Sequence, residues 1–292
     1  MTTVETTAAP GSALRVALRT AHSRSLADLG LNAIGRARFG WRDRSIGSVV
    51  ERAGGRYWLR VVWSARDRAR GSWWTGNRDA SQIDGVAKPR LLEVRAWEEG
   101  PLVYRAELMT LLPGRACATD AVLAGAPALD ESWWGELERN LEALSDARTD
   151  RMVLDPEIMR RRISVFFGIE MDIDSDDWVP SHGDLHWNNI HRDPFAIADW
   201  EAWGLAPRGY DAAFLLGHSL AVPHVADQIA RRFRRDLESE GGIVSQLYVM
   251  TKLLTRADAG EHEHLVPALH RHVGRLLGTR VPPGRRSSSS TT

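Results

Sequence analysis

The sequence predicts an α+β protein with a β-rich N-terminal lobe and a larger, mainly helical C-terminal lobe. Strand-like patterns run from about residue 36 to 112, and helical patterns follow from about 130. Pro113-Gly114 lies between the two and is the predicted hinge. A chain of 292 residues is long enough for two lobes around a cleft. The predicted boundaries are 1–112 for the first lobe (with 1–10 loose), 113–280 for the second, and 281–292 for a disordered polar tail.

The β-rich region contains five strand-like segments. RARFGWRDRSIGSVVERAGGRYWLRVVW at 36–63 predicts three strands, with Gly54-Gly55 as a hairpin signal between the last two. RLLEVRAWEEGPLVYRAELMTLL at 90–112 predicts two more, joined at Glu99-Gly100-Pro101. We therefore expect a five-stranded antiparallel sheet.

Helical spacing of apolar residues dominates the second lobe. The segment DESWWGELERNLEALSDA has Asp130 or Ser132 as its N-cap, and LDPEIMRRRISVFFG has Asp155 as its N-cap. Three further apolar-periodic segments follow between residues 211 and 278. These patterns predict a helical lobe that also contains the motifs described below.

Composition excludes several classes of protein. Hydrophobic residues make up 43% and charged residues 26%, an ordinary globular balance. The formal net charge is zero, so we expect no nucleic-acid or membrane partner. Cys117 is the only cysteine, which excludes an intrachain disulfide and a cysteine-based zinc site. Without a pattern typical of a signal peptide or a membrane span, we expect a cytoplasmic protein.

The stretch HGDLHWNN at 182–189 admits a metal-hydrolase interpretation. His182, Asp184 and His186 alternate, so on an extended strand they would share one face. Two imidazoles and a carboxylate can hold zinc or iron with an open position, and His191 or Asp199 could complete a two-metal site. This interpretation gives Asn189, and the pattern after it, no role.

Phosphoryl transfer is the second interpretation. Asp184 would accept a hydroxyl proton, and Asn189, five residues later, would bind Mg²⁺. Asp193-Pro194 turns the chain, Phe195 to Ala198 reads as a short buried strand, and Asp199 ends it as a second metal ligand. A third interpretation, in which the loop only satisfies its own backbone, explains an isolated HGD but not this longer pattern.

HGDLHWNN, AIADWE at 196–201 and GYDAA at 209–213 together resemble the aminoglycoside phosphotransferase family, within the superfamily of protein-kinase-like small-molecule kinases. The resemblance covers residues 182–214 strongly and 36–278 loosely. It implies a two-lobed protein-kinase-like fold, ATP or GTP as donor, and Mg²⁺.

The resemblance also assigns residue roles. It implies that Asp184 is the catalytic base, that Asn189 and Asp199 are Mg²⁺ ligands, and that His182 braces the loop. Asp211 precedes a helix-like run, so residue chemistry predicts an N-cap, whereas the family implies support of the catalytic loop. We expect Trp187, Trp200 and Trp203 to be packing residues rather than sugar-stacking platforms.

The nucleotide side departs from the usual patterns. No GxGxxG is present, and the candidate phosphate lid is a Ser/Gly turn entering a strand, with Ser45, Ser48 and Val49 as contacts. The family's loop is often serine-rich, which favours this choice over a plain hairpin. At the strand end, Thr110 and Leu112 are expected to contact the adenine through backbone groups and an apolar slot.

Arg60 stands where the third strand of a kinase carries a phosphate-binding lysine. Arginine is planar and permanently charged, so it is no equivalent point charge, although it can bind phosphate bidentately. A solvent-facing residue, and with it a nucleotide-binding pseudokinase, is the alternative. Asp79 or Asp84 is the candidate acidic partner. WTGNRDA at 74–80 is either a helix start, capped by Asn77 or Thr75, or a specialised phosphate-side element that replaces the usual salt bridge.

The acceptor is indicated only by charge. Aminoglycosides are polycations, so their sites need clustered carboxylates. An acidic run from Asp172 to Asp177, with Glu201 beyond the HGD motif, fits a cationic acceptor; Asp176, Asp177 and Glu201 are the candidate contacts. A solvated acidic loop is the alternative. The sequence therefore predicts an ATP-dependent O-phosphotransferase that acts on a hydroxyl of a small molecule.

Overall fold

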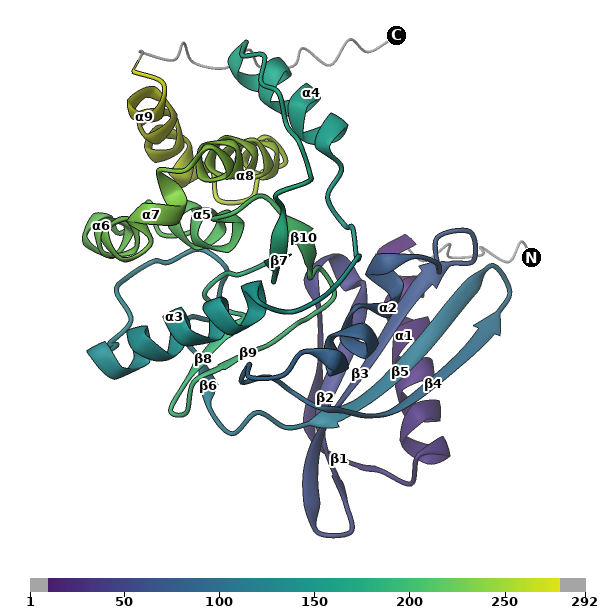
Figure 1. The fold of residues 1–292 in the computed structure, drawn as a ribbon. Helices are drawn as coiled ribbons and strands as arrows, with labels where there is room; N and C mark the ends of the chain where they lie inside the picture. The colour runs from purple at the N-terminus through teal and green to yellow at the C-terminus, as the bar shows by residue number, and fades with distance from the viewer. Residues whose placement is uncertain (1–9, 279–292) are drawn as a thin grey trace, which may run out of the picture. The chain divides into compact units, whose positions relative to one another are not determined.

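The computed structural model describes residues 10–278 and divides into two compact units (Figure 1). The first unit takes in the chain as far as Ser81 together with 88–113, and the second takes in 82–87 and the chain from Gly114 onward. The predicted disordered tail 281–292, and the predicted loose N-terminus up to residue 9, lie outside the described residues.

The first unit is built on one antiparallel sheet of five strands, as predicted. Its spatial order is β1-β2-β3-β5-β4, so β3 lies at the centre. Ala53 and Gly54 adopt left-handed conformations (φ 51° and 76°) between β2 and β3, so the hairpin turn lies one residue before the predicted Gly54-Gly55 pair, and Gly55 begins β3. The strands are β1 (Asn32–Phe39), β2 (Ser45–Arg52), β3 (Gly55–Ala65), β4 (Leu91–Glu99) and β5 (Leu102–Thr110).

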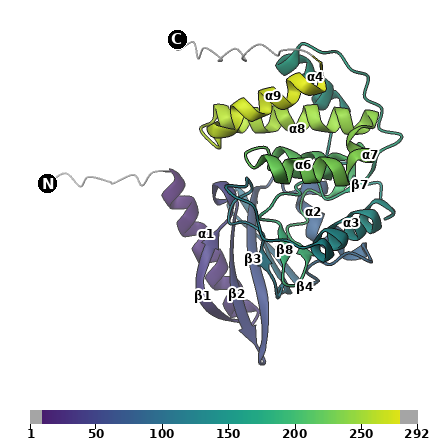
Figure 2. The same cartoon turned by 90° about the vertical axis from the view of Figure 1, so that its left-hand side faces the viewer.

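Two helices cover opposite faces of this sheet (Figures 1 and 2). Helix α1 (Pro10–Asp28) packs against β2, β3 and β5, and α2 (Ser72–Asp79) lies on the other face. The sequence did not predict α1. Its buried positions do recur at helical spacing, but they include His22 and Ser25, so the apolar stripe is interrupted.

Strand alternation separates the sheet into two chemically different faces. Leu59, Val61 and Leu108 are fully buried in the core beneath α1. Arg60 and Glu107, cross-strand partners in β3 and β5, point to the opposite side, which we call the α2 face. The first unit thus has an apolar face and a charged one.

The second unit is mainly helical, with two small sheets. Helix α8 packs against α4, α5, α7 and α9. Strands β6, β8 and β9 form one antiparallel sheet, and β7 pairs with β10. The elements are α3 (Glu131–Ser145), α4 (Pro156–Phe167), α5 (Tyr210–Gly217), α6 (Pro223–Arg232), α7 (Arg234–Leu237), α8 (Glu240–Asp258), α9 (Val266–Leu276), β6 (Arg115–Ala116), β7 (Val179–Ser181), β8 (Ile190–Arg192), β9 (Ala196–Ile197) and β10 (Gly204–Ala206); short 3₁₀ turns occupy Trp41–Asp43, Ala80–Gln82 and Glu263–Leu265.

The predicted helix starts are confirmed. The Asp130 carboxylate accepts the Trp133 N–H, and that of Asp155 accepts the N–H groups of Glu157 and Ile158. Five helices, rather than three segments, lie between 210 and 276, because the chain breaks at Phe233 between α6 and α7 and the short α5 stands apart. Within residues 10–278 no helix is both long and apolar enough to cross a membrane.

Candidate active site

The HGD loop, residues 182–189, connects β7 to β8 in the second unit. Gly183 has φ 81°, and a Cβ built there would lie 2.3 Å from the carbonyl oxygen of Ala202. Both the conformation and the close approach require glycine. The middle residue of the HGD motif is therefore fixed by backbone geometry.

Asp211 holds the start of this loop. Its carboxylate accepts the His182 N–H at 2.6 Å and the Gly183 N–H at 2.9 Å. Burial raises the pKa of Asp211, although the two N–H donors and His182 oppose that shift. The predicted N-cap role is wrong, because α5 begins at Tyr210 after the left-handed Gly209, which places Asp211 inside the first turn.

Ala198 ties the end of β9 to both ends of the HGD loop. Its carbonyl oxygen lies 2.9 Å from Nε2 of His182, and its N–H donates to the carbonyl oxygen of Asn189 at 2.7 Å. The His182 ring is fully buried and meets the Trp200 ring edge-on at 4.9 Å. Asp199 follows Ala198 directly, so its backbone is anchored beside His182 and Asn189.

The Asn189 amide is oriented by Asp184. Its Nδ2 donates to the carbonyl oxygen of Asp184 at 3.0 Å and approaches Oδ2 of Asp184 at 3.4 Å. The amide oxygen is then the atom left for a cation. Together with the exposed carboxylate of Asp199, it is a donor set of hard oxygens that fits Mg²⁺.

Asp184 lies in a positive environment and its side chain is 30% exposed. Burial by itself would raise the pKa of Asp184. The hydrogen bond and charge of His186, with the charges of Lys252 and His182, outweigh burial and hold the pKa well below its ordinary value. Nε2 of His186 lies 3.5 Å from Oδ2 of Asp184. The carboxylate is therefore ionised at neutral pH.

Sequence reasoning missed Lys252 and left His186 without a role. Lys252, on α8, donates to the Tyr210 hydroxyl at 3.2 Å and lies 4.9 Å from the Phe214 ring centroid. Burial lowers the pKa of Lys252 to about 8, with Asp184 opposing. One signal was available: only Lys88 and Lys252 are lysines among 38 basic residues, so a lysine here is unusual for this chain.

The cluster required by the hydrolase interpretation is not formed. Among residues 10–278, no group of three or more His, Cys, Asp or Glu side chains is arranged to hold a metal ion. The three tryptophans near the loop are buried, as predicted for packing residues: Trp187 bonds Ser219 Oγ, Trp200 bonds the Ile197 carbonyl, and Trp203 lies beneath Arg151.

On the α2 face of the first unit, the carboxylate of Glu107 gathers three groups. Nη2 of Arg105 lies 2.8 Å from Oε1, Nη1 of Arg60 lies 3.6 Å from Oε2, and Nδ2 of Asn77 donates to Oε2 at 2.8 Å. Glu107 has no exposed surface. Sequence reasoning missed this acidic partner because it lies on β5, not on the neighbouring helix.

The other predictions around α2 need correction. Asn77 and Thr75 are not caps, because α2 begins at Ser72 after Gly71 and both residues lie inside the helix. Asp84 falls in the segment 82–87, which belongs to the second unit. Asp79 ends α2, where its carboxylate accepts the hydroxyl of Thr75.

The segment predicted as a Ser/Gly turn covering the phosphates is a strand in the structure. Residues 45–49 lie within β2, and the turn before them is 40–44. Ser48 points toward α1, where its hydroxyl lies 2.9 Å from Nε2 of the buried His22, so its side chain is not on the Arg60 side. Ser45 and Val49 are on that side, flanking Gly47, the cross-strand partner of Arg60.

The remaining predicted contacts lie in both units, two in the first and three in the second. Thr110 ends β5, and its hydroxyl accepts the Arg90 N–H at 2.9 Å, while Leu112 follows half-buried. Asp176 and Asp177 are exposed, and the Asp176 N–H donates to the Asp174 carboxylate. The carbonyl oxygen of Glu201 accepts Nη2 of Arg151 at 2.9 Å.

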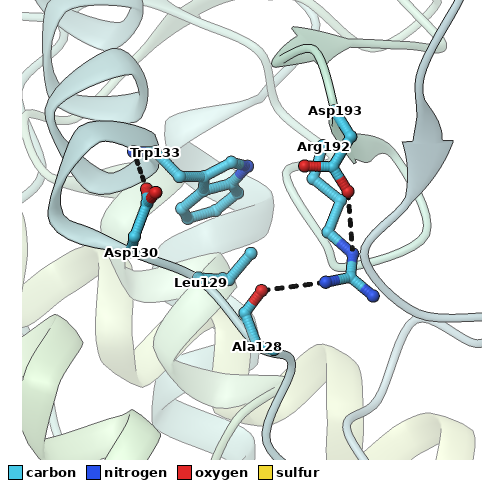
Figure 3. Close-up of a pocket in the computed structure, with 6 residues that line it drawn as sticks. All are labelled: Ala128, Leu129, Asp130, Trp133, Arg192 and Asp193. Atoms are coloured by element: carbon cyan, nitrogen blue, oxygen red, sulfur yellow. Dashed lines mark hydrogen bonds and ion pairs between the residues drawn. The ribbon is translucent and has the colours of Figure 1, made fainter.

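A surface pocket of the second unit lies elsewhere, between the start of α3 and the end of β8 (Figure 3). Nη1 of Arg192 donates to the carbonyl oxygen of Ala128 across it at 2.8 Å. None of the predicted site residues lines this pocket, which is formed by Ala128, Leu129, Asp130, Trp133, Arg192 and Asp193.

The chain has a protein-kinase-like fold, which confirms the fold expected from the sequence. It is similar to a crystal structure of aminoglycoside phosphotransferase APH(4)-Ia, with a TM-score of 0.57, 12% identity, and coverage of 89% of this chain and 98% of that one. A thermostable mutant of that protein, in a ternary complex with ADP and hygromycin B, matches with a TM-score of 0.54, 14% identity, and coverage of 92% and 99%. No protein-family model and no curated protein matches the sequence.

Proposed function

We propose that this protein is an ATP-dependent O-phosphotransferase, which transfers the γ-phosphoryl group to a hydroxyl of a small molecule. The observation that carries the proposal is the anchoring of Asp184, Asn189 and Asp199 around one loop. Phosphoryl transfer depends mainly on positioning and charge neutralisation, because its transition state is loose. Polar groups fixed by backbone hydrogen bonds supply that positioning without reorganisation.

Asp184 would receive the proton of the acceptor hydroxyl. The hydroxyl oxygen forms the new bond to the γ-phosphorus, and the bond from that phosphorus to the β,γ-bridging oxygen breaks, which releases ADP. The depressed pKa of Asp184 keeps it an ionised hydrogen-bond acceptor. Its main contribution is therefore to orient the hydroxyl, with proton transfer late in the reaction.

Asn189 and Asp199 would hold Mg²⁺ through their oxygen atoms. The ion, when bound, neutralises charge on the donor phosphates. His182 and Asp211 would keep the loop in place, and Arg60, with Ser45 and Val49 on the same sheet face, would contact the phosphates. Backbone groups from Thr110 to Leu112 are the proposed adenine contacts, and GTP is the alternative donor.

We propose a cationic, aminoglycoside-like acceptor, for which Glu201, Asp176 and Asp177 are the candidate contacts. The exposure of Asp176 and Asp177 supports this choice. Hygromycin B, bound in the ternary complex named above, belongs in the first acceptor panel.

Calorimetric titration of ATP, with and without Mg²⁺, tests the donor side. We expect wild-type binding to require Mg²⁺ and to be lost in Asp199→Ala. Asp227→Ala removes an exposed carboxylate from α6 and should leave binding unchanged. Absence of binding for both ATP and GTP in the wild-type protein would overturn the proposal.

A nucleotide-binding module without turnover is the second candidate. Arg60 in place of the usual lysine favours it, since arginine is not an equivalent charge. Release of ADP in the presence of amino-sugar, choline-like, sugar and macrolide acceptors separates the two. Turnover with any acceptor supports the transferase; Mg²⁺-dependent binding with no turnover across the panel supports the binding module.

A further inference from the structure

Glu107 is a buried charge in the middle of a sheet. Glu107 has no exposed surface and lies on β5, beside the central strand β3. A buried carboxylate is costly unless it is paired and hydrogen-bonded. The chain meets that requirement with Arg105, Arg60 and Asn77, so the cluster is specifically built around this carboxylate.

The two arginines are held differently. Arg105 pairs tightly with Glu107 at 2.8 Å, lies beneath the Trp74 ring at 4.4 Å, and has a side chain only 7% exposed. Arg60 pairs at 3.6 Å and its side chain is 14% exposed. Arg105 is thus enclosed by its neighbours, while Arg60 reaches further toward the surface of the α2 face.

The charge balance around Glu107 also favours a role beyond packing. One carboxylate is shared by two guanidinium groups, although the Arg105 pair alone would satisfy its charge. The Glu107 carboxylate lies 3.6 Å from Nη1 of Arg60, so the attraction between the two charges limits the orientation of that guanidinium. A planar guanidinium held in one orientation is suited to bind phosphate oxygens bidentately.

We propose that Glu107 is a positioning residue that holds the Arg60 guanidinium toward the donor phosphates, and that Asn77 couples helix α2 to this pair. The inference rests on the proposed phosphotransferase function. Glu107 itself touches no substrate: it acts through Arg60. Asn77 adds the link from α2, because its amide donates to the same oxygen that Arg60 approaches.

A double-mutant cycle on Mg²⁺-ATP affinity tests this coupling. Glu107→Gln keeps the shape and removes the charge, and Arg60→Met removes the guanidinium. We expect each single change to raise the Kd for Mg²⁺-ATP about tenfold, the loss typical of one charge-assisted contact. In the Arg60→Met background, Glu107→Gln should add less than about twofold, because its effect passes through Arg60.

Two further variants complete the design. Glu98→Gln breaks the exposed pair of Glu98 with Arg66 on the same sheet and should leave the Kd unchanged. If Glu107→Gln does not fold, as judged by circular dichroism, Asn77→Ala takes its place in the cycle. It removes one hydrogen bond to Glu107 and should raise the Kd by about threefold in the wild-type background and not in Arg60→Met.

The outcomes separate this inference from the proposed function. Equal losses from Glu107→Gln in both backgrounds, or none in either, would overturn the positioning role while the kinase proposal stands. A wild-type protein that binds neither ATP nor GTP would overturn the proposed function and this inference with it.

Discussion

The HGD loop and the α2 face gather polar groups by different means. In the HGD loop, the groups that are anchored are mostly backbone groups: the Asp211 carboxylate accepts two loop N–H groups, and the Ala198 backbone binds the His182 ring and the Asn189 carbonyl. On the α2 face, side chains from two strands and a helix meet around Glu107. The first arrangement comes from nearly contiguous sequence, the second from residues that only strand register brings together.

This difference determines how visible each region is in the sequence. A tight loop whose backbone is anchored at several points requires particular residues at fixed spacing, such as Gly183, and so leaves a motif in the sequence. A cross-strand cluster leaves a weaker trace in the sequence, namely that its members occupy alternate positions of their strands. A shift of one residue in register would move Glu107 to the opposite face, and the sequence does not give the register. Arg60 could be predicted from its strand, whereas Glu107 could not.

The largest expected effect is on the rate of phosphoryl transfer and comes from a change in the HGD loop, not on the α2 face. Asp184→Asn should lower the rate of phosphoryl transfer by about 10²- to 10⁴-fold, the usual contribution of a positioned base. Affinity for Mg²⁺-ATP should stay within about twofold of the wild-type value, because the donor contacts are retained. Steady-state ADP release and calorimetry measure both, with Asp150→Asn, an exposed loop change, as control. Transfer within about tenfold of wild type would contradict the role of Asp184.

Asp211→Ala should show how strongly the HGD loop depends on one side chain. The change leaves the buried N–H groups of His182 and Gly183 without their acceptor. We expect the free energy of unfolding in urea to fall by about 3 kcal/mol, since hydrogen bonds to a charged group are among the strong ones. Asp227→Ala on the surface of α6 should change it by less than about 0.5 kcal/mol. Equal stability of the two variants would refute this account of the loop.

Acid sensitivity should also originate near the HGD loop. Burial lowers the pKa of His218 from an ordinary 6.5 to about 3, and its ring lies 5.7 Å from that of His186. The unfolded chain then binds a proton that the folded chain does not. The neutral His218 ring therefore contributes its full stabilisation above pH 6.5. Between pH 6.5 and about 3 the free energy of unfolding falls, by up to about 1.4 kcal/mol per pH unit.

His218→Gln tests this source of acid sensitivity. Between pH 7 and pH 4, the free energy of unfolding in urea should fall less steeply with pH in this variant than in the wild-type protein. The difference in slope should correspond to one bound proton at most. Substitution of the exposed His224 by glutamine should leave the slope unchanged. Parallel curves for wild type and His218→Gln would show that His218 does not titrate as described.

The smallest effect concerns the two serines of strand β2 that were predicted to contact the phosphates. Ser48→Ala removes the buried contact with His22 and should cost about 1 kcal/mol of stability, with the Mg²⁺-ATP affinity unchanged. Ser45→Ala removes a hydroxyl from the face of the sheet that carries Arg60. A change in Mg²⁺-ATP affinity is therefore expected in this variant and not in Ser48→Ala. A loss of nucleotide affinity in Ser48→Ala, with none in Ser45→Ala, would contradict this assignment of the two serines to opposite faces.

Elements with an uninterrupted pattern were predictable, and those with a mixed pattern were not. The five strands, and the helix starts at Asp130 and Asp155, follow from periodicity and capping chemistry. Helix α1 was missed because polar His22 sits on its buried face. Residues 45–49 were expected to form a turn because Ser and Gly are typical of turns, and the sequence does not give the register that places them in a strand. Lys252 and Glu107 reach their partners only through tertiary packing.

The segment 82–87 has a consequence for how the chain is made. It lies between strands of the first unit but belongs to the second, where the Ala87 N–H donates to Asn140 Oδ1 and its carbonyl oxygen accepts the Ile197 N–H. During synthesis on the ribosome, the sheet can be complete once Thr110 has emerged. The hydrogen-bond partners of Ala87 at positions 140 and 197 are synthesised much later, so its two hydrogen bonds form only after they emerge. No single cut in the chain yields both units whole, so an experiment on isolated units would need segment 82–87 to be taken out of the first and joined to the second.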